Sequence, residues 1–156
     1  MATNLKNLNT IQGEIPNGKS WKFAIVVSAW NEVITGALLT GALEALSKAE
    51  VPASNILIKN VPGTFELPLG AQREAQKENI DAVICLGCVI QGETRHFDFI
   101  CDATANGIIQ VGLKYNKPVI FGVLTTENMK QALERAGGEH GNKGFEAGIT
   151  ALQMLG

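Results

Sequence analysis

Residues 82–99 have the sequence AVICLGCVIQGETRHFDF, which joins an apolar half to a polar half. Its first half, residues 82–90, is an uncharged apolar run of strand length, which is typical of a strand buried on both faces of a parallel sheet. Its second half, residues 91–96, is polar and contains a glycine, which predicts a loop at the carboxyl end of that strand. Open α/β sheets bind ligands at this edge, so the loop and its histidine, His96, are the first candidates for a functional site.

The composition is typical of a soluble globular chain. It has 156 residues, 46% of them hydrophobic and 18% charged, which is enough for one domain with a full core. Thirteen basic and fifteen acidic residues give a net charge of −2 without a basic block, which argues against nucleic-acid binding. No apolar run approaches membrane-spanning length, and residues 1–20 lack the apolar core of a signal peptide. We therefore expect no membrane association and a cytoplasmic location.

Two short motifs suggest chemistry that their context argues against. Cys85 and Cys88 have the C-x-x-C spacing of metal and redox sites, but at this odd spacing in a strand their side chains point to opposite faces. Residues 13–20, GEIPNGKS, match a phosphate-binding loop, which must follow a buried strand and open a helix. Here the preceding sequence is polar and a strand is expected next. We interpret both matches as coincidences.

The remaining sequence alternates between strand and helix patterns. Apolar, β-branched runs predict strands at residues 21–29, 56–61, 82–90 and 118–124. Helical periodicity predicts helices that end near residues 49, 77, 115, 136 and 155. This alternation predicts a single α/β domain over residues 21–156: a three-layer α/β/α sandwich around a four-stranded parallel sheet, flavodoxin-like, preceded by an arm at residues 1–20.

Few polar groups follow the predicted strands. They are Asn31, Thr64, Glu66, residues 91–96 and the region of Thr125. Among them only His96 is of a type that changes charge near neutral pH, which makes it the natural proton carrier.

Each candidate also has a structural interpretation, and a histidine in a loop, such as His96, can be incidental. Trp30 can serve as packing in the core. Thr64 can cap a helix whose first turn holds Glu66 as a dipole-favoured acid, and Arg135 can be a solvated cation at a helix end. From the residues alone, the chain is an α/β domain with a pocket for a small molecule.

Six blocks between residues 30 and 144 resemble the lumazine synthase (6,7-dimethyl-8-ribityllumazine synthase) family. They are WN at 30–31, VPGTFELP at 61–68, GETRHFD at 92–98, FGVLTTEN at 121–128, ERAG at 134–137 and GNKG at 141–144. The resemblance implies the condensation of 5-amino-6-(D-ribitylamino)uracil with 3,4-dihydroxy-2-butanone 4-phosphate in riboflavin biosynthesis, with loss of phosphate and water. It implies small-molecule substrates, no cofactor and no metal.

The resemblance also assigns roles to residues. His96 would be catalytic and carry protons. The pyrimidine and its ribityl chain would be bound by Trp30, Asn31, Thr64, Phe65, Glu66, Cys88, Val89, Ile90, Phe121 and Lys143. Phosphate would be bound by Glu93, Thr94 and Arg135. Phe121 and Arg135 would come from a neighbouring subunit.

Three positions depart from the family pattern that the resemblance suggests. Position 30 is usually Phe and is Trp30 here, and position 29 is often Arg and is Ala29 here. Position 93 is usually small, whereas Glu93 places an acid beside the implied phosphate site.

The resemblance further implies a pentamer. Residues 136–144 lack an insertion between the last two helices, which implies assembly of twelve pentamers into a sixty-subunit icosahedral cage, and the family is compatible with an association with riboflavin synthase. Two alternatives have other functions: a flavodoxin-like flavin-binding or signalling module, and a non-catalytic shell-forming protein. The flavin module does not require His96 together with Arg135.

Overall fold

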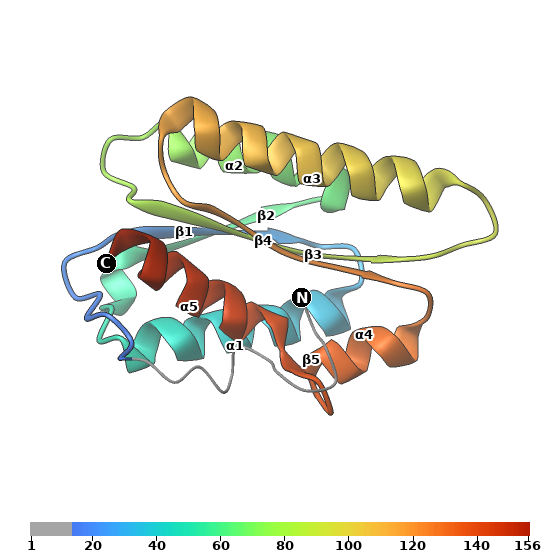
Figure 1. Ribbon diagram of the computed structural model, residues 1–156, viewed down its shortest axis with the longest axis horizontal. Helices are drawn as coiled ribbons and strands as arrows, with labels where there is room; N and C mark the ends of the chain where they lie inside the picture. The colour runs from blue at the N-terminus through green and yellow to red at the C-terminus, as the bar shows by residue number, and fades with distance from the viewer. Residues whose placement is uncertain (1–13) are drawn as a thin grey trace.

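The computed structural model describes residues 14–156 and has a parallel four-stranded sheet between two helical layers (Figure 1). The strands are β1 (Phe23–Ser28), β2 (Ile56–Val61), β3 (Ala82–Ile90) and β4 (Val119–Thr126), in the order β2-β1-β3-β4. The predicted three-layer α/β/α fold is therefore confirmed. β4 extends to Thr126, two residues beyond the prediction, and β1 is shorter than predicted at both ends.

The helices form one layer on each face of the sheet (Figure 1). One layer holds α1 (Glu32–Lys48), α4 (Met129–Arg135) and α5 (Lys143–Leu155), and the other holds α2 (Leu67–Ala75) and α3 (His96–Tyr115). Short 3₁₀ helices, η2 and η3, cover Ala53–Asn55 and Thr64–Glu66. A hairpin that the sequence analysis missed, β5 (Ala136–Gly138) with β6 (Gly141–Asn142), joins α4 to α5.

The sheet separates two apolar cores. Cys88 belongs to the core on the α1 and α5 side, whereas Cys85 belongs to the core under α2 and α3. The prediction that the two thiols point to opposite faces is therefore confirmed. Burial raises the pKa of Cys85 to about 12 and that of Cys88 to about 11, so both thiols stay protonated at neutral pH.

Close packing of α1 on α5 fixes the amino end of α5. A Cβ on Gly144 would overlap the backbone of Leu38 in α1, so only glycine allows this approach. Asn142 caps α5: its Oδ1 accepts from the backbone N of Gly144 at 2.8 Å and of Phe145 at 3.1 Å. Its Nδ2 donates to the carbonyl oxygen of Ala37 at 2.9 Å. The first residue of α5, Lys143, is thus held in place against α1.

The helix caps differ in part from expectation. The side chain of Asn128 accepts from the backbone N of Gln131 at 2.9 Å and caps α4. The predicted capping role of Thr64 is wrong, because Thr64 lies inside the 3₁₀ helix and caps no helix with its side chain. Pro68 stands at the start of α2 and has no N–H to satisfy, so this end needs less capping.

Residues 14–20 form neither helix nor strand, and Gly18 among them is hydrogen-bonded to the residue that follows α1. The backbone N of Gly18 donates to the carbonyl oxygen of Ala49 at 2.7 Å. β1 follows, so the expectation that a strand rather than a helix comes after the GEIPNGKS match is confirmed. Most of the predicted arm, residues 1–13, lies outside the described residues. Over residues 14–156, no helix is both long and apolar enough to cross a membrane.

Candidate functional site

A cavity of about 420 Å³ lies at the carboxyl ends of β1 and β3, and we call it the switch-point cavity. From β1 the chain continues into α1 on one face of the sheet, and from β3 into α3 on the other, so the two strand ends diverge around a crevice. Nine of the predicted site residues line it: Trp30, Asn31, Thr64, Phe65, Glu66, Cys88, Val89, Ile90 and His96. The sequence analysis missed two further lining residues, Gly63 and Ile100.

Asn31 links the end of β1 to β3 in the cavity wall. Its backbone is left-handed, with φ 60° and ψ 47°, a conformation that asparagine tolerates better than most residues. Its Nδ2 donates to the carbonyl oxygen of Cys88 at 2.9 Å. This bond fixes the amide of Asn31 at the end of β1 beside the backbone of β3.

Two aromatic side chains lie exposed at this cavity. Trp30 is 72% exposed and Phe65 is 56% exposed, although large aromatic side chains are usually buried. Trp30 therefore does not pack in the core of this chain, and that interpretation is wrong. Exposed rings beside a cavity suit a flat ligand that stacks on them.

His96 begins α3 and presents its side chain at the same cavity. Its backbone N donates to the hydroxyl of Thr94 at 3.4 Å. Ile100 lies one turn further along α3, at the i+4 spacing that could have indicated it. The cavity thus combines stacking surfaces, an amide and an imidazole.

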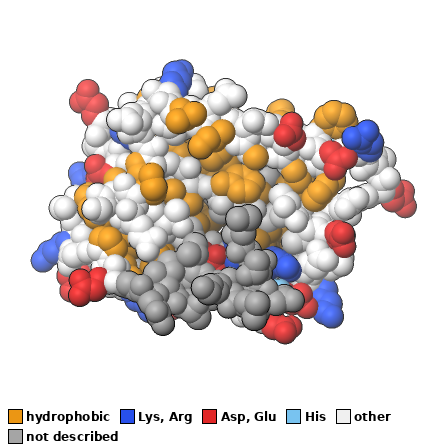
Figure 2. Space-filling model, in the orientation of Figure 1, with side chains coloured by type: hydrophobic (Ala, Val, Ile, Leu, Met, Phe, Trp, Pro, Cys, Tyr) orange, Lys and Arg blue, Asp and Glu red, His pale blue; other side chains and the backbone are white. Residues whose placement is uncertain are grey.

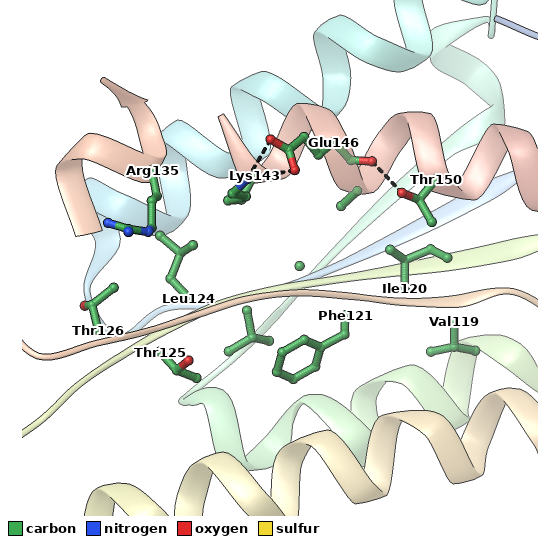
Figure 3. A pocket seen from close by; sticks show the side chains of 13 residues that line it. Val119, Ile120, Phe121, Leu124, Thr125, Thr126, Arg135, Lys143, Glu146 and Thr150 are labelled. Atoms are coloured by element: carbon green, nitrogen blue, oxygen red, sulfur yellow. Dashed lines mark hydrogen bonds and ion pairs between the residues drawn. The ribbon is translucent and has the colours of Figure 1, made fainter. Parts of the chain in front are cut away.

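A second cavity, of about 570 Å³, lies between β4 and α5, and we call it the edge-strand cavity (Figure 3). Three of the other five predicted site residues, Phe121, Arg135 and Lys143, line it, and none of the described residues lines both cavities. β4 is an edge strand, and Phe121 on it is 43% exposed. Figure 2 shows apolar side chains gathered near the middle of the face that presents β4.

The edge-strand cavity carries two cationic side chains. Arg135 ends α4, where the helix dipole favours a cation, and its Nη1 donates to the carbonyl oxygen of Gln131 at 3.1 Å. The ammonium of Lys143 contacts the two carboxylate oxygens of Glu146 at 2.7 and 2.8 Å (Figure 3). The sequence analysis missed Glu146, Thr126 and Thr150 in this wall. The carboxylate of Glu134 lies 4.0 Å from Arg135 but does not line the cavity. Two cations and one carboxylate in the lining favour an anionic or oxygen-rich ligand.

The remaining two predicted residues, Glu93 and Thr94, line neither cavity. They lie in the exposed loop between β3 and α3, and the side chain of Glu93 is exposed. Their role in phosphate binding stays a prediction.

Comparison with known proteins identifies the family. The family model described as 6,7-dimethyl-8-ribityllumazine synthase matches residues 20–156. A protein of that name from Cytophaga hutchinsonii is 66% identical over 96% of this chain and 94% of its own length. One from Flavobacterium johnsoniae is 54% identical over 99% of this chain and 82% of its own length. One from Porphyromonas gingivalis is 50% identical and covers 100% of this chain and 98% of its own. The chain therefore belongs to the 6,7-dimethyl-8-ribityllumazine synthase family, a family of transferases in riboflavin biosynthesis.

Proposed function

We propose that this chain condenses 5-amino-6-(D-ribitylamino)uracil with 3,4-dihydroxy-2-butanone 4-phosphate to 6,7-dimethyl-8-ribityllumazine, releasing phosphate and water. The observation that carries the proposal is the switch-point cavity, where the exposed ring of Trp30, the fixed amide of Asn31 and the imidazole of His96 line one space. These are the groups needed to hold a flat, polar heterocycle and to move a proton beside it.

Each group has a part in the proposed reaction. Trp30 stacks on the pyrimidine, and Asn31 and Glu66 bind its polar edge and ribityl chain. His96 takes up and returns a proton as the imine forms and as phosphate leaves. Arg135 binds the phosphate with its planar guanidinium. Most of the acceleration comes from holding the two reactants together, which makes ring closure nearly unimolecular.

A turnover assay tests this function. The purified protein is incubated with both substrates, product formation is followed by chromatography, and the uncatalysed rate without protein is subtracted. Turnover above that rate supports the proposal. Its absence would favour the two alternatives that the family match disfavours, a flavin-binding module or a non-catalytic shell-forming protein.

We also infer that neighbouring subunits complete the site in a pentamer. Two features support this: the predicted binding residues divide between two cavities, and α3 exposes large apolar side chains, with Phe99 at 69%, Ile109 at 56% and Leu113 at 75%. Exposed apolar side chains of this size are common where subunits pack. Phe121 and Arg135 would enter the neighbour's switch-point cavity.

A larger assembly is part of the same proposal. Only two residues, Glu139 and His140, separate β5 from β6, so the joint between α4 and α5 is short, as proposed for a cage of twelve pentamers. Five chains of 16.6 kDa give about 83 kDa and sixty give about 996 kDa, which analytical ultracentrifugation separates easily. A boundary near the smaller mass in several buffers would support the pentamer and contradict the cage. A boundary near 16.6 kDa would contradict both assemblies.

We further propose a cytoplasmic protein that acts on small molecules, binds neither nucleic acid nor membrane, and can associate with riboflavin synthase. The net charge of −2 supports the absence of nucleic-acid binding. Co-sedimentation of the assembly with purified riboflavin synthase tests the association.

A further inference from the structure

Lys143 and Glu146 form the most deeply buried ion pair of the described residues. Their side chains are 15% and 6% exposed, whereas the pair Lys48–Glu44 is 55% and 57% exposed. In the pair Lys77–Glu74 only the carboxylate is buried, because its lysine is 42% exposed. Both members of the Lys143–Glu146 pair line the edge-strand cavity (Figure 3).

The position of Lys143 is unfavourable for stability alone. It is the first residue of α5, where the positive end of the helix dipole repels a cation. Glu146, in the first turn, offsets this repulsion and places its carboxylate against the ammonium. Buried ion pairs add little net stability compared with apolar residues of the same size. A cation held at this place therefore points to a role in binding.

The hydrogen bonds of the pair leave donor capacity in the cavity wall. An ammonium has three N–H donors, and the two recorded bonds of Lys143 both go to the carboxylate of Glu146. The hydroxyl of Thr150 donates to the backbone oxygen of Glu146 and not to its carboxylate. Within residues 14–156, the carboxylate of Glu146 therefore bonds to the ammonium alone, and the ammonium keeps a donor for a ligand.

We infer that Glu146 is a positioning residue that holds the ammonium of Lys143 ready to donate to an oxygen of the pyrimidine substrate or its ribityl chain. The inference rests on the proposed function. A lysine side chain loses much rotamer freedom when it is fixed, and the carboxylate fixes it before the substrate binds. Glu146 itself need not touch the substrate.

Glu146→Gln tests the inference, because the amide keeps the size of the side chain and removes its charge. We expect the KM for the pyrimidine substrate to rise about tenfold, with kcat and the KM for the phosphate substrate little changed. The matched control is Glu74→Gln, which neutralises an equally buried carboxylate, also paired with a lysine three residues away, on the opposite face of the sheet. It should leave both KM values unchanged. Glu146→Asp keeps the charge and should retain part of the affinity for the pyrimidine substrate. If Glu146→Gln does not fold, the KM of Glu146→Asp tests the inference instead.

A double variant separates positioning from direct contact. If Glu146 acts through Lys143, Lys143→Met with Glu146→Gln should have the KM of Lys143→Met alone. Three results would each overturn the inference: KM increases of the two single variants that add in the double variant, a wild-type KM in Glu146→Gln, or an equal rise of the KM in Glu74→Gln. In each case turnover by the wild type still supports the proposed function. Absence of wild-type turnover would overturn both.

Discussion

The two cavities differ in the parts of the chain that form them and in the side chains that line them. The switch-point cavity is assembled from three regions far apart in the sequence, residues 30–31, 63–66 and 88–100, and it offers rings, an amide and an imidazole. The bond from Asn31 to Cys88 joins the first region to the third. The edge-strand cavity comes from one continuous part of the chain, residues 119–150, and offers Arg135 and Lys143 beside an exposed edge strand. The first suits a flat heterocycle, and the second suits an anionic or oxygen-rich group.

In one copy of the chain, the residues predicted to bind the two substrates lie in two separate cavities. None of the described residues lines both cavities, so the proposed reaction between a heterocycle and a phosphorylated ketone would require groups from both to meet. A neighbouring subunit is the simplest source of the missing half, as proposed above. Substitutions in one cavity at a time test whether the two cavities have separate roles.

The largest effect should come from His96 in the switch-point cavity. His96→Ala removes the proton carrier, so kcat should fall, and general acid–base groups contribute roughly 10²–10⁴-fold. Binding of the pyrimidine, measured by calorimetry, should change little. The uncatalysed condensation sets a floor to the loss. A variant with wild-type kcat would remove the proton-carrying role.

Arg135 in the edge-strand cavity should give the next largest effect. Arg135→Ala should lower kcat/KM for the phosphate substrate about a hundredfold by removing a charge-assisted, bidentate contact. Lys at this position restores the charge but not the planar fork, so rescue should be partial. Inorganic phosphate should compete with this substrate in the wild type. Equal phosphate binding by wild type and Arg135→Ala would contradict the assignment.

Mixed assemblies test whether the two halves come from different subunits. We expect His96→Ala and Arg135→Ala chains, denatured together and reassembled, to recover activity at about a quarter of the wild-type level, because about a quarter of the interfaces combine two intact halves. Each variant reassembled alone is the control and should stay nearly inactive. If the mixture shows only the average of the two controls, both halves belong to the same chain.

The sequence predicted the switch-point cavity better than the edge-strand cavity for physical reasons. Parallel strands have their carboxyl ends at the same edge of the sheet, so the groups that follow β1, β2 and β3 could be placed at one edge from the strand-helix alternation alone. The hairpin between α4 and α5 has no strand-like pattern and depends on Gly137 and Gly141 with φ of 116° and 75°. The i, i+3 spacing of Lys143 and Glu146 is compatible with an ion pair on any helix surface, and only the packing of α5 beside β4 places this pair in the cavity wall.

A smaller effect is expected from Trp30. Removing the exposed ring should weaken binding of riboflavin, which presents a flat heterocycle and a ribityl chain, by about tenfold. Isothermal titration of wild type and Trp30→Ala measures it, and quenching of the flavin fluorescence should be lost in parallel. Trp30→Phe should keep most of the affinity. Equal affinity in wild type and Trp30→Ala would show that the ring has no part in stacking.

The smallest effect should come from Glu93, which lines neither cavity and whose side chain is exposed. If Thr94 and Arg135 bind phosphate, the nearby acid repels it through water, and Glu93→Ser should lower the KM for the phosphate substrate about twofold at low ionic strength. High salt should abolish the difference, because screening weakens charge–charge repulsion between exposed groups. Glu78→Ser is the matched control, since Glu78 is also exposed but precedes β3 at the opposite edge of the sheet. A rise in KM that persists at high salt would mean that Glu93 contacts the substrate directly, and the division between the two cavities would then have to include this loop.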